Sequence, residues 1–117
     1  MKRVLYQGIG FLTAALLGAF VFSASPAGAG DDVYTITIKD HRFNPVDLEI
    51  PAGKKVKLVI KNLDSTPEEF ESHELGREKI ILGGREGVVY IGPLDPGTYT
   101  YFGEFNPETA QGRIIVK

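Results

Sequence analysis

The chain has 117 residues and a formal net charge of −2, and it contains no cysteine, no tryptophan and one methionine, the initiator. This length suits one domain with a short extension, and the lack of cysteine excludes disulfides, thiolate metal sites and thiol nucleophiles. The acidic balance argues against a nucleic-acid partner, which requires a dense basic patch.

The N-terminal segment has the pattern of a secretory signal. Two basic residues precede an apolar run over residues 8–22, and the small residues Ala27 and Ala29 fit the small-x-small rule of a cleavage site. We predict that residues 1–29 are a cleaved signal peptide and that residues 30–117 form the exported domain. The alternative is an uncleaved membrane anchor, although the apolar run is short for a span of ~20 residues.

Cleavage changes the charge of the mature protein. It removes two basic residues and no acidic one, so 11 basic and 15 acidic residues remain and the net charge becomes −4. An exported domain of this size without disulfides depends on one well-made apolar core. Its acidic surface favours cations over anions as ligands.

The mature chain is predicted to be all-β. Apolar and polar residues alternate with a period of two, which is typical of strands with one buried face, and turns rich in Pro and Gly separate the runs. No helical period is convincing, although residues 107–110 are a candidate for one helical turn. Seven or eight short strands predict a β-sandwich. In chain order, the expected strands cover residues 34–38, 46–50, 56–61, 69–75, 77–82, 88–91, 98–102 and 113–116.

Five segments carry a resemblance to a known family: Phe43-x-Pro45, residues 48–53, 56–62 and 96–101, and the final strand at 112–116. Together they resemble a cupredoxin, over essentially the whole mature chain. This resemblance implies a cupredoxin-like Greek-key β-sandwich. Tyr99, two residues after Gly97, also fits a tyrosine corner that locks such a sandwich.

The usual blue-copper ligands of that family are missing. A blue-copper site needs two histidines, one cysteine thiolate and usually a weak axial methionine. The resemblance places Glu68 and Asn106 at the histidine positions, Gly103 at the cysteine position and Ala110 at the methionine position. Without the thiolate we expect no type 1 copper and no blue-copper electron transfer.

Residues 68–74 replace those ligands with four carboxylates and one histidine, in the order Glu-Glu-Phe-Glu-Ser-His-Glu. Alternate side chains of a strand share a face, so if Phe70 packs in the core, Glu68 points inward at the end of the sandwich. Neighbours on one face lie ~6.5–7 Å apart, a spacing that long carboxylates can bridge onto one ion. The outward candidate ligands are Glu69, Glu71 and His73.

A second candidate set lies at the end of the sandwich. His41 is in a loop that, in cupredoxins, lies near the metal end, and two glutamates flank the lost cysteine and histidine positions. The two sets are alternatives or parts of one extended site. A simpler interpretation of the glutamates is a solvated strand edge that discourages aggregation. The end ligands would be His41, Glu68, Glu104 and Glu108.

Oxygen ligands with one or two imidazoles suit Fe²⁺, Fe³⁺, Mn²⁺, Zn²⁺ or Cu²⁺ rather than Cu⁺. Residues 62–75 resemble the cupredoxin-like proteins of bacterial ferrous-iron uptake, the EfeO type, which work beside an oxidase-dependent iron permease. That resemblance implies a periplasmic protein that binds copper or iron and helps to oxidise or hand over Fe²⁺.

We therefore predict a periplasmic protein that captures Fe²⁺ and passes it to a permease, and that is a binding and transfer protein more than an enzyme. Two alternatives stay open. One is a metal-free interaction module that docks by its acidic end. The other is a small ferroxidase, which would need copper at the same ligands. Acidic edges and a shared metal would also allow a homodimer.

Overall fold

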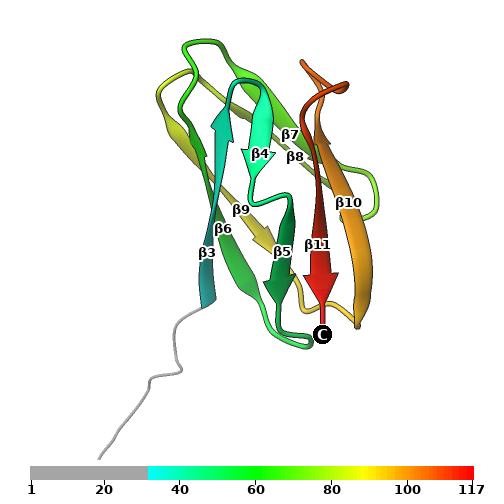
Figure 1. Ribbon diagram of the computed structural model, residues 1–117. Coiled ribbons are helices and arrows are strands. Elements are labelled where there is room, and N and C mark those ends of the chain that lie inside the picture. The colour runs from blue at the N-terminus through cyan, green and yellow to red at the C-terminus, as the bar shows by residue number, and fades with distance from the viewer. Residues whose placement is uncertain (1–31) are drawn as a thin grey trace, which may run out of the picture. The chain divides into compact units, whose positions relative to one another are not determined.

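The computed structural model describes residues 32–117, and the predicted signal peptide lies outside them. Nine strands are present in this part of the chain, and they form two sheets that face each other (Figure 1). The strands are β3 (Asp32–Lys39), β4 (Arg42–Asn44), β5 (Asp47–Ile50), β6 (Val56–Asn62), β7 (Glu68–Ser72), β8 (Arg77–Ile81), β9 (Glu86–Ile91), β10 (Gly97–Gly103) and β11 (Gln111–Val116).

One sheet has the strand order β4-β3-β6-β9, and the other has the order β5-β11-β10-β7-β8. Two pairs, β3 with β6 and β5 with β11, are parallel, and the others are antiparallel. The chain therefore crosses between the sheets instead of forming a series of hairpins. This confirms the predicted all-β sandwich, with one strand more than expected.

The additional strand is β4, and its short length explains why the sequence did not predict it. It has three residues, of which only Phe43 is buried, so there is no alternation to detect. In the longer strands the alternation matches burial well: β6 alternates between buried and more accessible residues along most of its length. The inner faces supply the core, which includes Ile36, Ile38, Leu58, Ile60, Phe70, Ile81, Ile91, Tyr101 and Ile114.

Three aromatic rings join the two sheets beside β7. The Phe43 ring lies 4.9 Å from the Tyr101 ring and 6.3 Å from the Phe70 ring, and the Phe70 and Tyr101 rings are 4.9 Å apart. Aromatic pairs at such distances add to the free energy gained by burial. Because Phe70 is anchored in this cluster, the residues on either side of it point away from the core.

The structure confirms the predicted tyrosine corner and corrects two other local predictions. The Tyr99 hydroxyl donates to the Asp95 carbonyl at 2.9 Å, which confirms the tyrosine corner. The strand expected over residues 69–75 ends at Ser72, because a turn begins at His73. Residues 107–110 form hydrogen-bonded turns and no helix. Within residues 32–117 there is no helix long and apolar enough to cross a membrane.

Candidate metal centre

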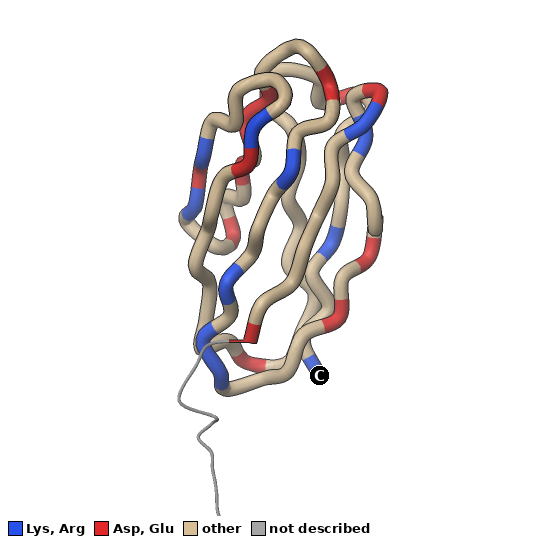
Figure 2. The backbone as a smooth tube through the Cα atoms, turned by 90° about the vertical axis from the view of Figure 1, so that its left-hand side faces the viewer, with Lys and Arg blue, Asp and Glu red and all other residues tan. Residues whose placement is uncertain are grey.

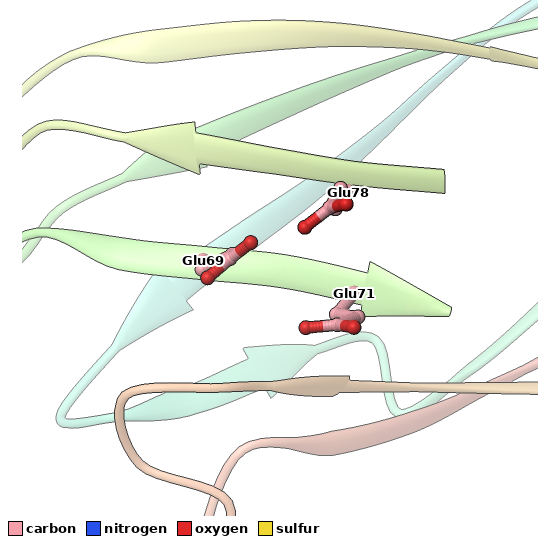
Figure 3. Close-up of side chains that lie close together, drawn as sticks. All are labelled: Glu69, Glu71 and Glu78. Atoms are coloured by element: carbon pink, nitrogen blue, oxygen red, sulfur yellow. The ribbon is translucent and has the colours of Figure 1, made fainter. Parts of the chain in front are cut away.

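Three carboxylates converge on the outer face of the five-stranded sheet. Glu69 and Glu71 lie on β7, and Glu78 lies on β8, directly opposite Glu71 in the antiparallel register. One carboxylate oxygen from each lies within 4.8 Å of the others. Figure 3 shows the three side chains leaving two neighbouring strands and turning toward one another. We call these residues the outer-face cluster.

The negative charge of the outer-face cluster is not balanced by basic side chains. No Lys or Arg makes an ion pair with these three glutamates in the described part of the chain. A hydrogen bond to Glu78 raises the pKa of Glu69, and desolvation and the charges of Glu71, Glu78 and Glu104 raise it further. Like charges held this close favour either a shared proton or a bound cation.

His73 lies beside the outer-face cluster. Its Nε2 is 3.1 Å from Oε2 of Glu71, and its ring packs edge-on against Phe102 at 5.5 Å. The His73 side chain is 77% exposed, so it can reach a ligand from solvent. Of the expected outward set, Glu69 and Glu71 lie in the outer-face cluster, whereas His73 lies in the turn and not in the strand and approaches Glu71 alone.

The four candidate ligands at the end of the sandwich do not form one cluster in the described part of the chain. Glu68 is fully buried, as its inward position predicted, and its carboxylate accepts hydrogen bonds from the backbone of Phe105 and the side chain of Asn106. The Glu104 amide donates to the Glu69 carbonyl at 2.8 Å, so Glu104 lies near the outer-face cluster. Its charge accordingly raises the pKa of Glu69.

His41 and Glu108 line one shallow hollow at the loop end of the sandwich, with residues 105–107 and Thr109. The His41 ring is 3.6 Å from the Asp64 carboxylate, which also accepts the backbone N–H groups of Asp40 and His41. The pKa of Asp64 is lowered, mainly because its carboxylate accepts a hydrogen bond from the His41 backbone N–H group. His41 therefore has a carboxylate partner of its own, separate from the outer-face cluster.

Sequence reasoning missed Glu78. Its place depends on the register between β7 and β8, which pairs Glu71 with Glu78 and Ser72 with Arg77. The available signal in the sequence was Gly76, because glycine favours the left-handed backbone of a tight turn. In the structure Gly76 has a φ of 63° and ends the four-residue turn that begins at His73. A hairpin closed by that turn places Glu71 and Glu78 opposite each other.

The outer-face cluster offers oxygen ligands, with one imidazole next to them. Carboxylates suit hard cations, and an added imidazole extends the range to Fe, Zn or Cu²⁺. Acidic and basic positions are spread along the strands and loops, without one acidic end (Figure 2). Local geometry, and not the net charge of one end, therefore distinguishes the outer-face cluster.

The positions that the resemblance gives to the blue-copper ligands do not suit type 1 copper. The four residues are Glu68, Gly103, Asn106 and Ala110, and they supply no sulfur and no imidazole. The one carboxylate among them is already hydrogen-bonded. This set does not provide the thiolate and two imidazoles that type 1 copper needs.

The raised pKa of Glu69 predicts a stabilising substitution. Because the folded state binds a proton more tightly than the unfolded state, stability falls as the pH rises from about 4.3 toward the folded pKa. Metal-free Glu69→Gln protein is expected to have a higher urea midpoint than the wild type at pH 7, and the gain should disappear below about pH 4.

Urea unfolding at pH 7 and at acidic pH measures this difference, with Glu86→Gln on β9 as the control. The control should change the midpoint little at either pH. An unchanged or lower midpoint for Glu69→Gln at pH 7 would show that repulsion within the outer-face cluster is not a cost to folding.

Comparison with known proteins shows similarity to one family. The model of the family described as "Cupredoxin-like domain" matches residues 12–116. A curated relative, an uncharacterized protein of Rickettsia prowazekii (strain Madrid E), is 52% identical over 81 residues, which are 69% of this chain. The match covers 65% of that relative's own length.

Solved structures show the same fold at low identity. Auracyanin A, a "blue" copper protein of Chloroflexus aurantiacus, is 16% identical with a TM-score of 0.63, covering 75% of this chain and all of that one. The metal binding domain of the Cu(I)-exporting P-type ATPase CopA of Streptococcus pneumoniae D39 is 15% identical with a TM-score of 0.62. That match covers 73% of this chain and 84% of the domain.

Proposed function

The chain belongs to the cupredoxin-like domain family, and from this premise we propose that it is an exported, periplasmic protein that binds a metal ion and assists bacterial iron uptake. The ligands that we propose are Glu69, Glu71 and Glu78, with His73 as a fourth ligand or as a partner that orients Glu71. The observation that supports this proposal is the convergence of three carboxylates that form no ion pair with a Lys or Arg within residues 32–117.

Cation binding would relieve the electrostatic cost of the outer-face cluster. Glu71 and Glu78 lie directly opposite on neighbouring strands, where like charges destabilise a sheet. A divalent cation between the carboxylates would replace repulsion by attraction. The folded protein thus presents a preformed site, and binding of an ion lowers the free energy of the folded state.

The ligand chemistry favours iron, Zn²⁺ or Cu²⁺ over Ca²⁺ and Mg²⁺. Three carboxylates form a hard oxygen site, and the His73 imidazole adds a borderline ligand that Ca²⁺ and Mg²⁺ use little. Two of the structures to which the fold is similar are described as copper proteins or copper-binding domains. We propose Fe²⁺ as the cargo because the segment around β7 resembles iron-uptake proteins.

The position of the outer-face cluster suits capture and transfer of an ion. Glu78 and His73 are exposed, whereas Glu71 is only 20% exposed and is held on β7. β8 is an edge strand of its sheet, so a partner can approach from that side. The partner that we propose is an oxidase-dependent iron permease or another component of periplasmic iron uptake.

Anaerobic calorimetric titration of residues 30–117 with Fe²⁺, Cu²⁺ and Zn²⁺ tests the proposal. We expect one site tighter than about 10 μM, equivalent to about −7 kcal/mol, that Glu71→Gln weakens by about 10-fold or more. Glu86→Gln, which changes an exposed glutamate on the other sheet, should leave the affinity unchanged.

A wild-type protein without such a site would contradict metal binding and leave an interaction module as the alternative. Addition of air to the Fe²⁺-loaded protein separates transfer from oxidation. If the protein and its copper-loaded form leave the rate of Fe²⁺ oxidation by dioxygen unchanged, the role is capture and transfer alone.

A further inference from the structure

The four residues at the copper-ligand positions of the resemblance meet at the loop end of the sandwich, where Glu68, Gly103 and Ala110 are buried and Asn106 is half-buried. The Asn106 side-chain amide donates to Oε2 of Glu68 at 2.9 Å, and the Gly103 amide donates to the Ala110 carbonyl at 2.8 Å. Glu68 and Ala110 also lie next to Gly103, where they would contact any side chain added there. The positions converge although the ligands are absent.

The Glu68 carboxylate occupies the place where these residues meet. Its side chain is buried, with 1% relative exposure for the whole residue. Oε1 accepts the Phe105 amide at 2.9 Å and the Glu69 amide at 3.0 Å, and Oε2 accepts the Asn106 side chain. A buried carboxylate is tolerated when hydrogen-bond donors surround it in this way.

Gly103 leaves the space that the carboxylate needs. A Cβ atom at this position would lie 2.6 Å from Cδ and 2.7 Å from Oε2 of Glu68, and 2.7 Å from Cβ of Ala110. Such distances are well below van der Waals contact. A side chain at position 103 would therefore displace the Glu68 carboxylate from its hydrogen bonds, and Ala110 would have to move as well.

We propose that the interior copper position of the fold has become a metal-free junction, in which the Glu68 carboxylate ties β7 to residues 104–110. A bound ion joins its ligand loops by coordination. Here one carboxylate joins β7 to the loop by two hydrogen bonds, from the Phe105 amide and the Asn106 side chain, and a third bond, from the Glu69 amide, stays within β7. The junction also orients Glu104, whose amide donates to the Glu69 carbonyl. The junction goes beyond the proposed function: it binds no metal, and the Glu68 carboxylate holds the loop in place of an ion.

Two variants test the junction. Glu68→Gln keeps the shape of the side chain but is a poor metal ligand, so it should leave the Cu²⁺ and Fe²⁺ affinities within about threefold of the wild type. Glu68→Ala removes all three acceptor contacts, so it should lower the Tm by about 8 °C or more. It should also accelerate hydrogen exchange at the Phe105 amide.

Glu69→Ala, one residue along β7, is the matched control. It should weaken metal binding but leave Phe105 protected, which is the opposite profile. A double-mutant cycle adds a test of the geometry: Gly103→Ala should lower the Tm less in the Glu68→Ala background than in the wild type.

Either of two results overturns the junction. One is a loss of metal affinity above 10-fold in Glu68→Gln protein whose Tm is unchanged, because this would make Glu68 a ligand. The other is unchanged exchange of the Phe105 amide in Glu68→Ala. If the wild type binds no metal, the proposed function fails, and hydrogen exchange and the Tm still decide whether the junction exists.

Discussion

Replacing the three carboxylates of the outer-face cluster together, in Glu69→Gln/Glu71→Gln/Glu78→Gln protein, is expected to weaken Fe²⁺ and Cu²⁺ binding by at least about 100-fold. The reason is that amides keep the size of the side chains but supply no negative charge to the ion. A 100-fold loss corresponds to about 2.7 kcal/mol of binding free energy. Calorimetric titration measures it directly.

The same triple variant is expected to be more stable than the wild type when no metal is present. The substitutions remove the repulsion that raises the pKa of Glu69 and that opposes the pairing of Glu71 with Glu78. Weaker binding together with greater metal-free stability is the result expected for a preformed cation site, because its carboxylates repel one another until an ion binds. A variant that loses both would instead indicate damage to the sheet.

A charge-matched control separates local coordination from general electrostatics. Glu49→Gln/Glu86→Gln/Asp95→Asn protein changes the net charge by the same amount at exposed positions outside the outer-face cluster. It should bind the metal ion with nearly wild-type affinity at physiological ionic strength, because salt screens distant charges. An equal loss in the control would contradict a defined site.

Gly112→Ala is expected to lower the free energy of unfolding by about 3 kcal/mol. Gly112 lies opposite Tyr101 in the β10–β11 register, and the buried Tyr101 ring covers it. A Cβ atom would overlap Cζ of that ring and lie 2.5 Å from its hydroxyl oxygen. The ring packs against two other aromatic rings and has little room to move.

Urea unfolding of four proteins tests this packing: the wild type, Gly112→Ala, Tyr101→Leu and the double variant. Because leucine lacks the overlapping atoms, Gly112→Ala should cost clearly less in the Tyr101→Leu background. Equal costs in both backgrounds would mean that the ring is not the cause. The predicted loss concerns the core beside β7, so metal affinity of the folded fraction should not change.

The period-two alternation predicted most of the fold because each strand has one buried face. In β7 it also predicted the orientation of the side chains: Glu68, Phe70 and Ser72 are buried, and Glu69 and Glu71 are more accessible. It did not predict β4, which is too short to alternate, or the end of β7 at Ser72. There the Ser72 hydroxyl accepts the Leu75 amide at 3.1 Å within the turn.

The sequence by itself determined that this protein is an all-β sandwich of the cupredoxin-like kind. It also determined that the protein has no thiolate and that its carboxylates are concentrated around β7. Alternation and composition are local properties, so they can be read without knowing which strands pair. Only the tertiary structure decided that Glu78 joins Glu69 and Glu71, because strand register brings them together. Likewise, only packing decided that Glu68 is a buried hydrogen-bond acceptor, because two of its three donors lie 37 and 38 residues away along the chain.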